Sequence, residues 1–102
     1  MTLTPFIDLS LAETLAFYND LYALHSQRHP FPYAQECLLY ALYRQASQGD
    51  CCKAAPSKKN RVDFHKHAVW KALKGMPCAE AELLFKHQLS YLHQQLTELT
   101  EP

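Results

Sequence analysis

The last quarter of the chain carries apolar residues that recur at steps of four, four, three, four and three. These residues are Ala81, Phe85, Leu89, Leu92, Leu96 and Leu99. Residues three and four apart share one face of an α-helix, so the pattern predicts a long amphipathic helix whose apolar face must be covered by other elements. A chain built around such a helix is restricted to folds in which helices pack on it.

A capping box marks the start of an earlier helix. Ser10 and Glu13 are three residues apart, and their side chains can satisfy each other's backbone donors. Apolar residues then recur at helical spacing, which predicts a helix over about 11–27. The segment 29–32, HPFP, ends it, because proline cannot continue a helix and restricts the residue before it.

The middle of the chain predicts a second helix and a loop. Pro32 suits the first turn of a helix that runs to about Gln48, and Gly49 suits the left-handed position beyond a helix end. Residues 50–62, DCCKAAPSKKNRV, are polar and basic and contain a proline, which predicts a loop.

Asp63 is the expected N-cap of a third helix, FHKHAVWKALK, which stops at Gly75, and Pro77 then starts the fourth. No segment has a strand pattern and no internal repeat occurs. The 102 residues therefore predict a single all-α domain.

A net charge of zero conceals a basic central segment. Residues 44–74 carry eight lysines and arginines against two aspartates, or +6, while the rest carries two against eight acids, or −6. Such asymmetry indicates an anionic partner, and a solvated charged loop without a partner is the alternative. Because the positive charge is confined to one loop and one helix, we expect a small anion and no nucleic acid.

The cysteines Cys37, Cys51, Cys52 and Cys78 are expected to be free thiols. The chain starts with nothing resembling a signal peptide, and no apolar run is long enough to cross a membrane. We therefore predict a cytoplasmic protein without stable membrane insertion. A monomer is expected, although the sequence itself does not specify the oligomeric state.

Metal binding and catalysis are the less favoured alternatives. Cys51, Cys52, His65 and His67 are metal-ligand types, but adjacent cysteines seldom share one ion, and histidines two apart diverge on a helix. The carboxylates are dispersed, and no cysteine has a histidine at a fixed local spacing. We predict no metal site, no catalytic residue and no enzyme activity.

Residues 40–50, YALYRQASQGD, group two rings and a cation on one helix face. Tyr40 and Tyr43 can stack on a planar base or donate to phosphate, and Arg44 adds a fork of donors for phosphate oxygens. Aromatic residues at this spacing are also common in buried cores. The third helix repeats the mixture of rings and cations in Phe64, His65, Lys66, His67 and Trp70.

These segments resemble the acyl-CoA-binding proteins. The pattern YxxYRQASxGD at 40–50 is similar to that family's signature, with arginine and serine in place of lysine and threonine. The pattern DFxxxAxWxA at 63–72 is similar to its second signature, and the lysine-glycine pair at 74–75 to the one before its last helix. The resemblance is specific over 40–75 and weaker over about 10–96.

The resemblance implies a four-helix up-down-down-up bundle that binds long- or medium-chain acyl-CoA esters for transport and buffering, without catalysis or a cofactor. The domain would span 1–102, with 1–9 as an N-terminal extension and 50–62 as a basic loop. The alternative is a helical interaction module that keeps this fold, has lost CoA binding and offers its 89–99 stripe to a partner helix.

Site residues follow from the resemblance by position. Tyr40 would hydrogen-bond the 3′-phosphate, Tyr43 would support the adenine, and Arg44 would replace a phosphate-binding lysine. His65 stands where another head-group lysine is usual, and Phe85 where the family has a tyrosine against the nucleotide.

Further positions follow less directly. His25 aligns with a lysine of the family's first helix. Val69 stands where the family has a phosphate-binding lysine, and Lys66, Lys53 or the loop over 58–61 is a candidate to replace it. Leu24 and Cys37 are assigned to the acyl groove. Because histidines stand where lysines are usual, acyl-CoA affinity is expected to rise from about pH 8 to about pH 6.

Overall fold

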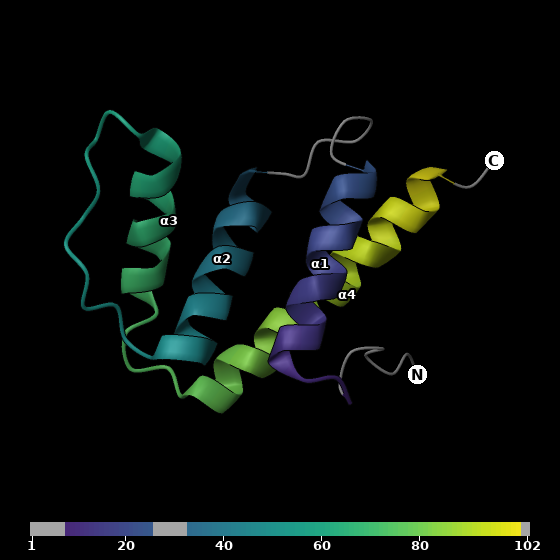
Figure 1. Ribbon diagram of the computed structural model, residues 1–102, viewed down its shortest axis with the longest axis horizontal. Helices are drawn as coiled ribbons and strands as arrows, with labels where there is room; N and C mark the ends of the chain where they lie inside the picture. Colours follow the sequence, from purple (N-terminus) through teal and green to yellow (C-terminus); the bar gives the residue numbers. More distant parts are fainter. Residues whose placement is uncertain (1–7, 26–32, 101–102) are drawn as a thin grey trace.

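The computed structural model describes residues 8–25 and 33–100. In chain order the helices are α1 (Leu11–His25), α2 (Tyr33–Gln48), α3 (Arg61–Ala72) and α4 (Cys78–Thr100). In Figure 1, α1 and α4 run upward while α2 and α3 run downward. No strand occurs in the described ranges, and the predicted all-α, up-down-down-up fold is confirmed.

The apolar stripe of α4 forms the core, as its spacing predicts. Helix α2 packs against both α4 and α3, and α1 packs against α4. The buried cluster comprises Leu21, Leu39, Leu42, Ala81, Phe85, Leu89, Leu92 and Leu96. Full burial of a leucine or phenylalanine stabilises a fold by about 1.5–3 kcal/mol. The stripe from Leu89 to Leu96 is therefore used inside the molecule, which leaves it unavailable to a partner helix.

Two helix ends have the local structure that the sequence predicts, namely the start of α1 and the end of α2. The backbone N–H of Ser10 donates to Oε1 of Glu13 over 3.0 Å, and the N–H of Glu13 donates to Oγ of Ser10 over 3.1 Å. These two bonds are the reciprocal pair of a capping box. Gly49 follows α2 with a φ of 81°, a conformation that favours glycine because it has no Cβ.

The predicted cap of α3 is wrong. Asn60 is the N-cap: its Oδ1 accepts from the N–H of Asp63 over 3.2 Å, and its Nδ2 donates to Oδ2 of Asp63 over 2.7 Å. Asparagine caps as well as aspartate, so α3 begins at Arg61, inside the predicted loop. Asp63 lies in the first turn, where a carboxylate is favoured by the helix dipole.

The other ends differ slightly or lie outside the described residues. Helix α3 ends at Ala72, because the N–H groups of Leu73 and Lys74 bond three residues back and tighten the last turn. The predicted extension of the first helix to residue 27 and the role of Pro32 fall outside the described ranges. Within those ranges, no helix combines the length and hydropathy that a bilayer span requires.

Candidate functional site

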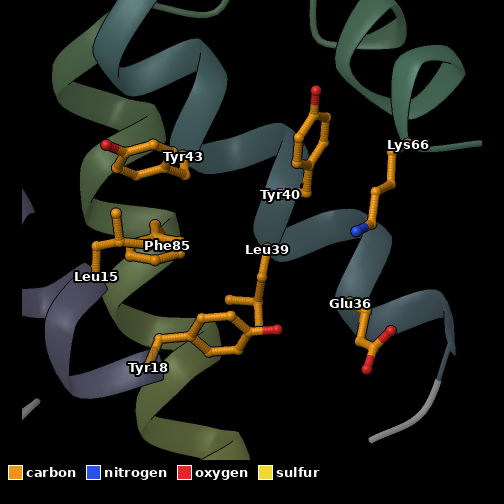
Figure 2. Close-up of a pocket in the computed structure, with 8 residues that line it drawn as sticks. All are labelled: Leu15, Tyr18, Glu36, Leu39, Tyr40, Tyr43, Lys66 and Phe85. Atoms are coloured by element: carbon orange, nitrogen blue, oxygen red, sulfur yellow. The ribbon is translucent and has the colours of Figure 1, made fainter. Parts of the chain in front are cut away.

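All four helices contribute side chains to one pocket of about 120 Å³ (Figure 2). It is lined by Leu15 and Tyr18 of α1, Glu36, Leu39, Tyr40 and Tyr43 of α2, Lys66 of α3, and Phe85 of α4. A cavity of roughly 150 Å³ holds benzene, so this space accepts about one ring or a short length of alkyl chain. Its wall combines aliphatic groups, rings and charges.

Two cations lie over the ring of Tyr40: Lys66, which lines the pocket, and Arg44, which does not. The guanidinium carbon of Arg44 lies 5.3 Å from the ring centroid, and Nζ of Lys66 lies 5.4 Å from it. Tyr40, Arg44 and Lys66 are all half-buried, so they are neither sealed in the core nor loose in solvent. A ring with two cations beside it can bind a ligand that joins an aromatic group to anionic oxygens.

Tyr43 and Phe85 form the aromatic side of the pocket. Their ring centroids are 5.9 Å apart at an interplanar angle of 53°, which is within the range of favourable aromatic pairs. Phe85 is 1% exposed and also belongs to the core cluster, whereas Tyr43 is half-buried. The core of the bundle thereby holds this wall in place.

Tyr18 brings a neutral phenol to the pocket from α1. Burial raises the pKa of Tyr18 to about 12, and the nearby Glu36 carboxylate and Tyr22 add to the shift. In Figure 2 its hydroxyl points toward α2. The phenol therefore remains uncharged throughout the physiological range.

Several predicted site residues lie away from this pocket. His65 is exposed, and its Nδ1 is hydrogen-bonded to the Tyr33 hydroxyl at 2.7 Å. Leu24 is 71% exposed and Cys37 is 3% exposed, and neither lines the pocket. The side chain of His25 lies outside the described part of the structure. The ligand roles of these four residues, and the pH effect tied to the histidines, stay predictions.

The signature residues Gln45 and Asp50 connect helix ends. Nε2 of Gln45 donates to Oδ1 of Asp50 and to the carbonyl of Met76, each over 2.9 Å. The N–H of Gly75 donates to the same Oδ1 over 2.9 Å. The bond from Gly75 and that from Gln45 lower the pKa of Asp50 below its ordinary value. The network ties the end of α2 to the segment before α4.

Trp70 adds a second tie at the same end of the bundle. It is 1% exposed, and its Nε1 donates to the carbonyl of Gly49 over 3.0 Å. The Arg44 guanidinium carbon lies 6.0 Å from the Trp70 ring centroid, so the tryptophan also supports one of the two cations at Tyr40.

The two histidines considered as metal ligands have separate partners. Nε2 of His67 lies 2.8 Å from the carbonyl oxygen of Lys53, whereas His65 meets Tyr33. Across the described ranges, no three histidine, cysteine or acidic side chains are arranged to hold a metal ion.

Sequence reasoning missed four of the lining residues. Leu15 and Tyr18 belong to the apolar pattern of the first helix, and Leu39 to that of the second, so they were interpretable only as core. Glu36 had a usable signal. It precedes Tyr40 by four residues, and the spacing that groups Tyr40 with Arg44 also places Glu36 on their face.

Comparisons with known proteins agree on one family. Residues 12–89, well over half of the chain, match the family model described as "Acyl CoA binding protein". Relatives include the "Acyl-CoA-binding domain-containing protein 4" of Arabidopsis thaliana, 44% identical over 55 residues. Another is the "Acyl-CoA-binding domain-containing protein 6" of Oryza sativa subsp. japonica, 46% identical over 48 residues.

The two relatives are much longer than this chain. The matches cover 54% and 47% of the chain but only 8% and 7% of those proteins. No solved structure matches the chain significantly. The family match spans α1, α2, α3 and the half of α4 that carries Phe85, which are the elements that build the pocket. On this match the chain belongs to the acyl-CoA-binding protein family.

Proposed function

We propose that this chain binds medium- or long-chain acyl-CoA thioesters reversibly and without catalysis. The observation that carries the proposal is that Arg44 and Lys66 both lie over the ring of Tyr40, which lines a partly apolar pocket, in a chain of this family. CoA joins a planar base to phosphates. This arrangement offers an aromatic ring to the base and positive charge to the phosphates.

The head group accounts for the charged side of the pocket. The Tyr40 hydroxyl donates to the 3′-phosphate, and Arg44 and Lys66 neutralise its charge. Tyr43 supports the adenine, and Phe85, which is 1% exposed, packs behind the Tyr43 ring. Lys66 replaces the lysine that is missing at Val69, which lies one turn further along α3. Charge-assisted hydrogen bonds of this kind contribute about 1.5–3 kcal/mol each.

The remaining assignments have less direct support. Leu24 and Cys37 contact the acyl chain, and His25 and His65 contact the head group. Because Cys37 is 3% exposed, contact there requires its neighbours to move aside on binding. We further propose that the chain acts as a monomer in the cytoplasm, buffering and carrying its ligand, with no cofactor and no nucleic-acid partner.

Isothermal titration calorimetry with palmitoyl-CoA, free CoA and palmitate in parallel tests the proposal. The thioester should bind more tightly than either part, because only it engages both the charged and the apolar surfaces. Tyr40→Phe should weaken binding of the thioester and of free CoA while leaving the helical circular dichroism unchanged. A folded chain that binds none of the three ligands would show that the fold has been kept and CoA binding lost.

A further inference from the structure

The segment between α2 and α3 carries two neighbouring thiols. Cys51 and Cys52 are both free; Cys52 is exposed and Cys51 is half-buried. Figure 1 shows this segment on the outer side of α3, away from α1 and α4. Neither cysteine lines the pocket. The pair therefore faces solvent and has no part in the binding site described above.

The two thiols lie between two fixed points of the chain. On one side, Oδ1 of Asp50 accepts a hydrogen bond from the N–H of Gly75 over 2.9 Å. On the other side, Nε2 of His67, a buried residue of α3, donates to the carbonyl of Lys53 over 2.8 Å. Sγ of Cys51 lies 3.9 Å from the same carbonyl oxygen. The pair is therefore held at a defined place beside α3.

Positive charge follows the thiols along the chain. The exposed cations of this stretch are Lys53, Lys58, Lys59 and Arg61. The salt bridge found in the described ranges joins Lys86 to Glu82, so none of these four cations is paired with a carboxylate there. A group of like charges raises the local concentration of an oppositely charged molecule, and with it the rate of encounter, by about tenfold or more. The thiols therefore stand where a polyanion such as CoA is attracted.

A cysteine in this setting can accept an acyl group from an acyl-CoA, because the thiolate is a strong nucleophile toward a thioester carbonyl. The thiol gives its proton to water, and Sγ forms a bond to the carbonyl carbon. The bond from that carbon to the CoA sulfur breaks, and CoA leaves as a thiolate that takes up a proton. One thioester replaces another, so the exchange needs no oxidant or reductant and is reversed by free CoA. The chain is consumed stoichiometrically and does not act as an enzyme.

We propose that the pair Cys51 and Cys52 is an S-acylation site that takes fatty acyl groups from acyl-CoA thioesters. Cys52 is the first acceptor because it is the exposed thiol of the two. The cations of the same stretch attract the CoA phosphates and bring the thioester to the sulfur. The inference goes beyond the proposed function, since it depends on this loop and not on the pocket.

Competition between the exposed thiols of one chain tests the inference. The full chain is incubated with an excess of palmitoyl-CoA, and peptide mass spectrometry locates the acyl group, which neutral hydroxylamine releases if it is a thioester. Cys78 is the internal control, since it is exposed at the start of α4 but has Glu80 in its own turn. Each rate is divided by the alkylation rate of the same thiol with iodoacetamide, which is uncharged and reports reactivity without charge attraction. This normalised rate should be roughly tenfold or more higher at Cys52 than at Cys78, and an excess of free CoA should remove the acyl group.

Two double variants separate the charge from the sulfur. Lys58→Gln combined with Lys59→Gln should lower the normalised rate at Cys52 and leave that at Cys78 unchanged. Cys51→Ser combined with Cys52→Ser should abolish acylation of the loop and keep the calorimetric affinity for palmitoyl-CoA. No acylation of the pair, a normalised rate equal to that of Cys78, or a rate unaffected by the lysine replacements would overturn the inference. Reversible binding by the double serine variant would then still support the proposed function.

Discussion

Gln45 donates a hydrogen bond from Nε2 to Oδ1 of Asp50 over 2.9 Å, across the turn that ends α2. Gln45 is fully buried and Asp50 is exposed, so the bond anchors a surface carboxylate to the interior. Through Asp50 the same network reaches the N–H of Gly75, just before α4. These residues of the family signature therefore support the helices that carry the pocket and do not line it themselves.

Replacing Gln45 should destabilise the fold. Gln45→Leu keeps approximate volume but removes the donors to Asp50 and to the carbonyl of Met76. We expect the free energy of unfolding to fall by about 1–3 kcal/mol, as for buried groups that lose a partner. Urea denaturation followed by circular dichroism measures the change. Gln48→Leu, on an exposed position of α2, is the control and should change it by less than about 0.5 kcal/mol.

Stability should depend on the Asp50 carboxylate at acid pH. Hydrogen bonds from Gly75 and Gln45 lower the pKa of Asp50 below its ordinary value of 3.8, so folding favours the ionised form. This contribution is present above the ordinary pKa and is lost as the pH falls through the folded-state pKa. Urea midpoints measured from neutral to acid pH should decline less steeply in Asp50→Asn than in the wild type. Asp20→Asn, at an exposed position of α1, is the control and should decline as the wild type does. Urea midpoints that fall equally in Asp50→Asn and in the wild type would contradict the prediction.

Tyr18 should make the fold sensitive to alkali. Its pKa is raised to about 12 from an ordinary value of 10.0, mainly by burial, so folding favours the neutral phenol. The contribution is complete below the ordinary pKa and is lost as the pH rises through the folded-state value. Tyr18→Phe should therefore reduce the loss of stability between those two pH values. In a spectrophotometric pH titration, the phenolate signal that appears at the highest pH should be absent from Tyr18→Phe. The same signal should remain in Tyr91→Phe.

Lys66 should contribute to CoA binding, whereas Lys71, an exposed lysine of the same helix, should not. Lys66→Met keeps much of the aliphatic stem but removes the ammonium that lies over the Tyr40 ring. A charge-assisted phosphate contact of about 1.5–3 kcal/mol corresponds to a loss of roughly ten- to a hundredfold in free-CoA affinity. Lys71→Met is the matched control, since Lys71 is exposed on α3 and does not line the pocket. Equal losses in the two variants would indicate general charge attraction in place of a specific contact.

The elements themselves were predictable because their signals are local. The reciprocal bonds of Ser10 and Glu13 span three residues, and the left-handed φ of Gly49 depends only on the helix that it ends. The apolar stripe of α4 predicted a buried helix face without specifying which helices would cover it. The cap of α3 could not be read from the sequence alone, because Asn60 and Asp63 are three residues apart and both residue types are good caps.

The residues that line the pocket could be identified only from the tertiary structure. His65 looked equivalent to a head-group lysine by position, yet it bonds to Tyr33, 32 residues earlier. Lys66, the next residue, instead reaches Tyr40. Neighbouring residues on a helix point in different directions, so only the docking of α3 on α2 determines which of them faces the site.

The chain's own order of residues was enough to determine four helices, their approximate ends and the family to which they belong, since helical periodicity, caps and short motifs act over a few neighbouring positions. Only the packed bundle decided that Glu36 and Lys66 share one pocket, with Tyr18 and Phe85 from two other helices. The physical reason is that contacts between distant segments depend on how whole helix faces fit together, and no short stretch of sequence specifies that fit.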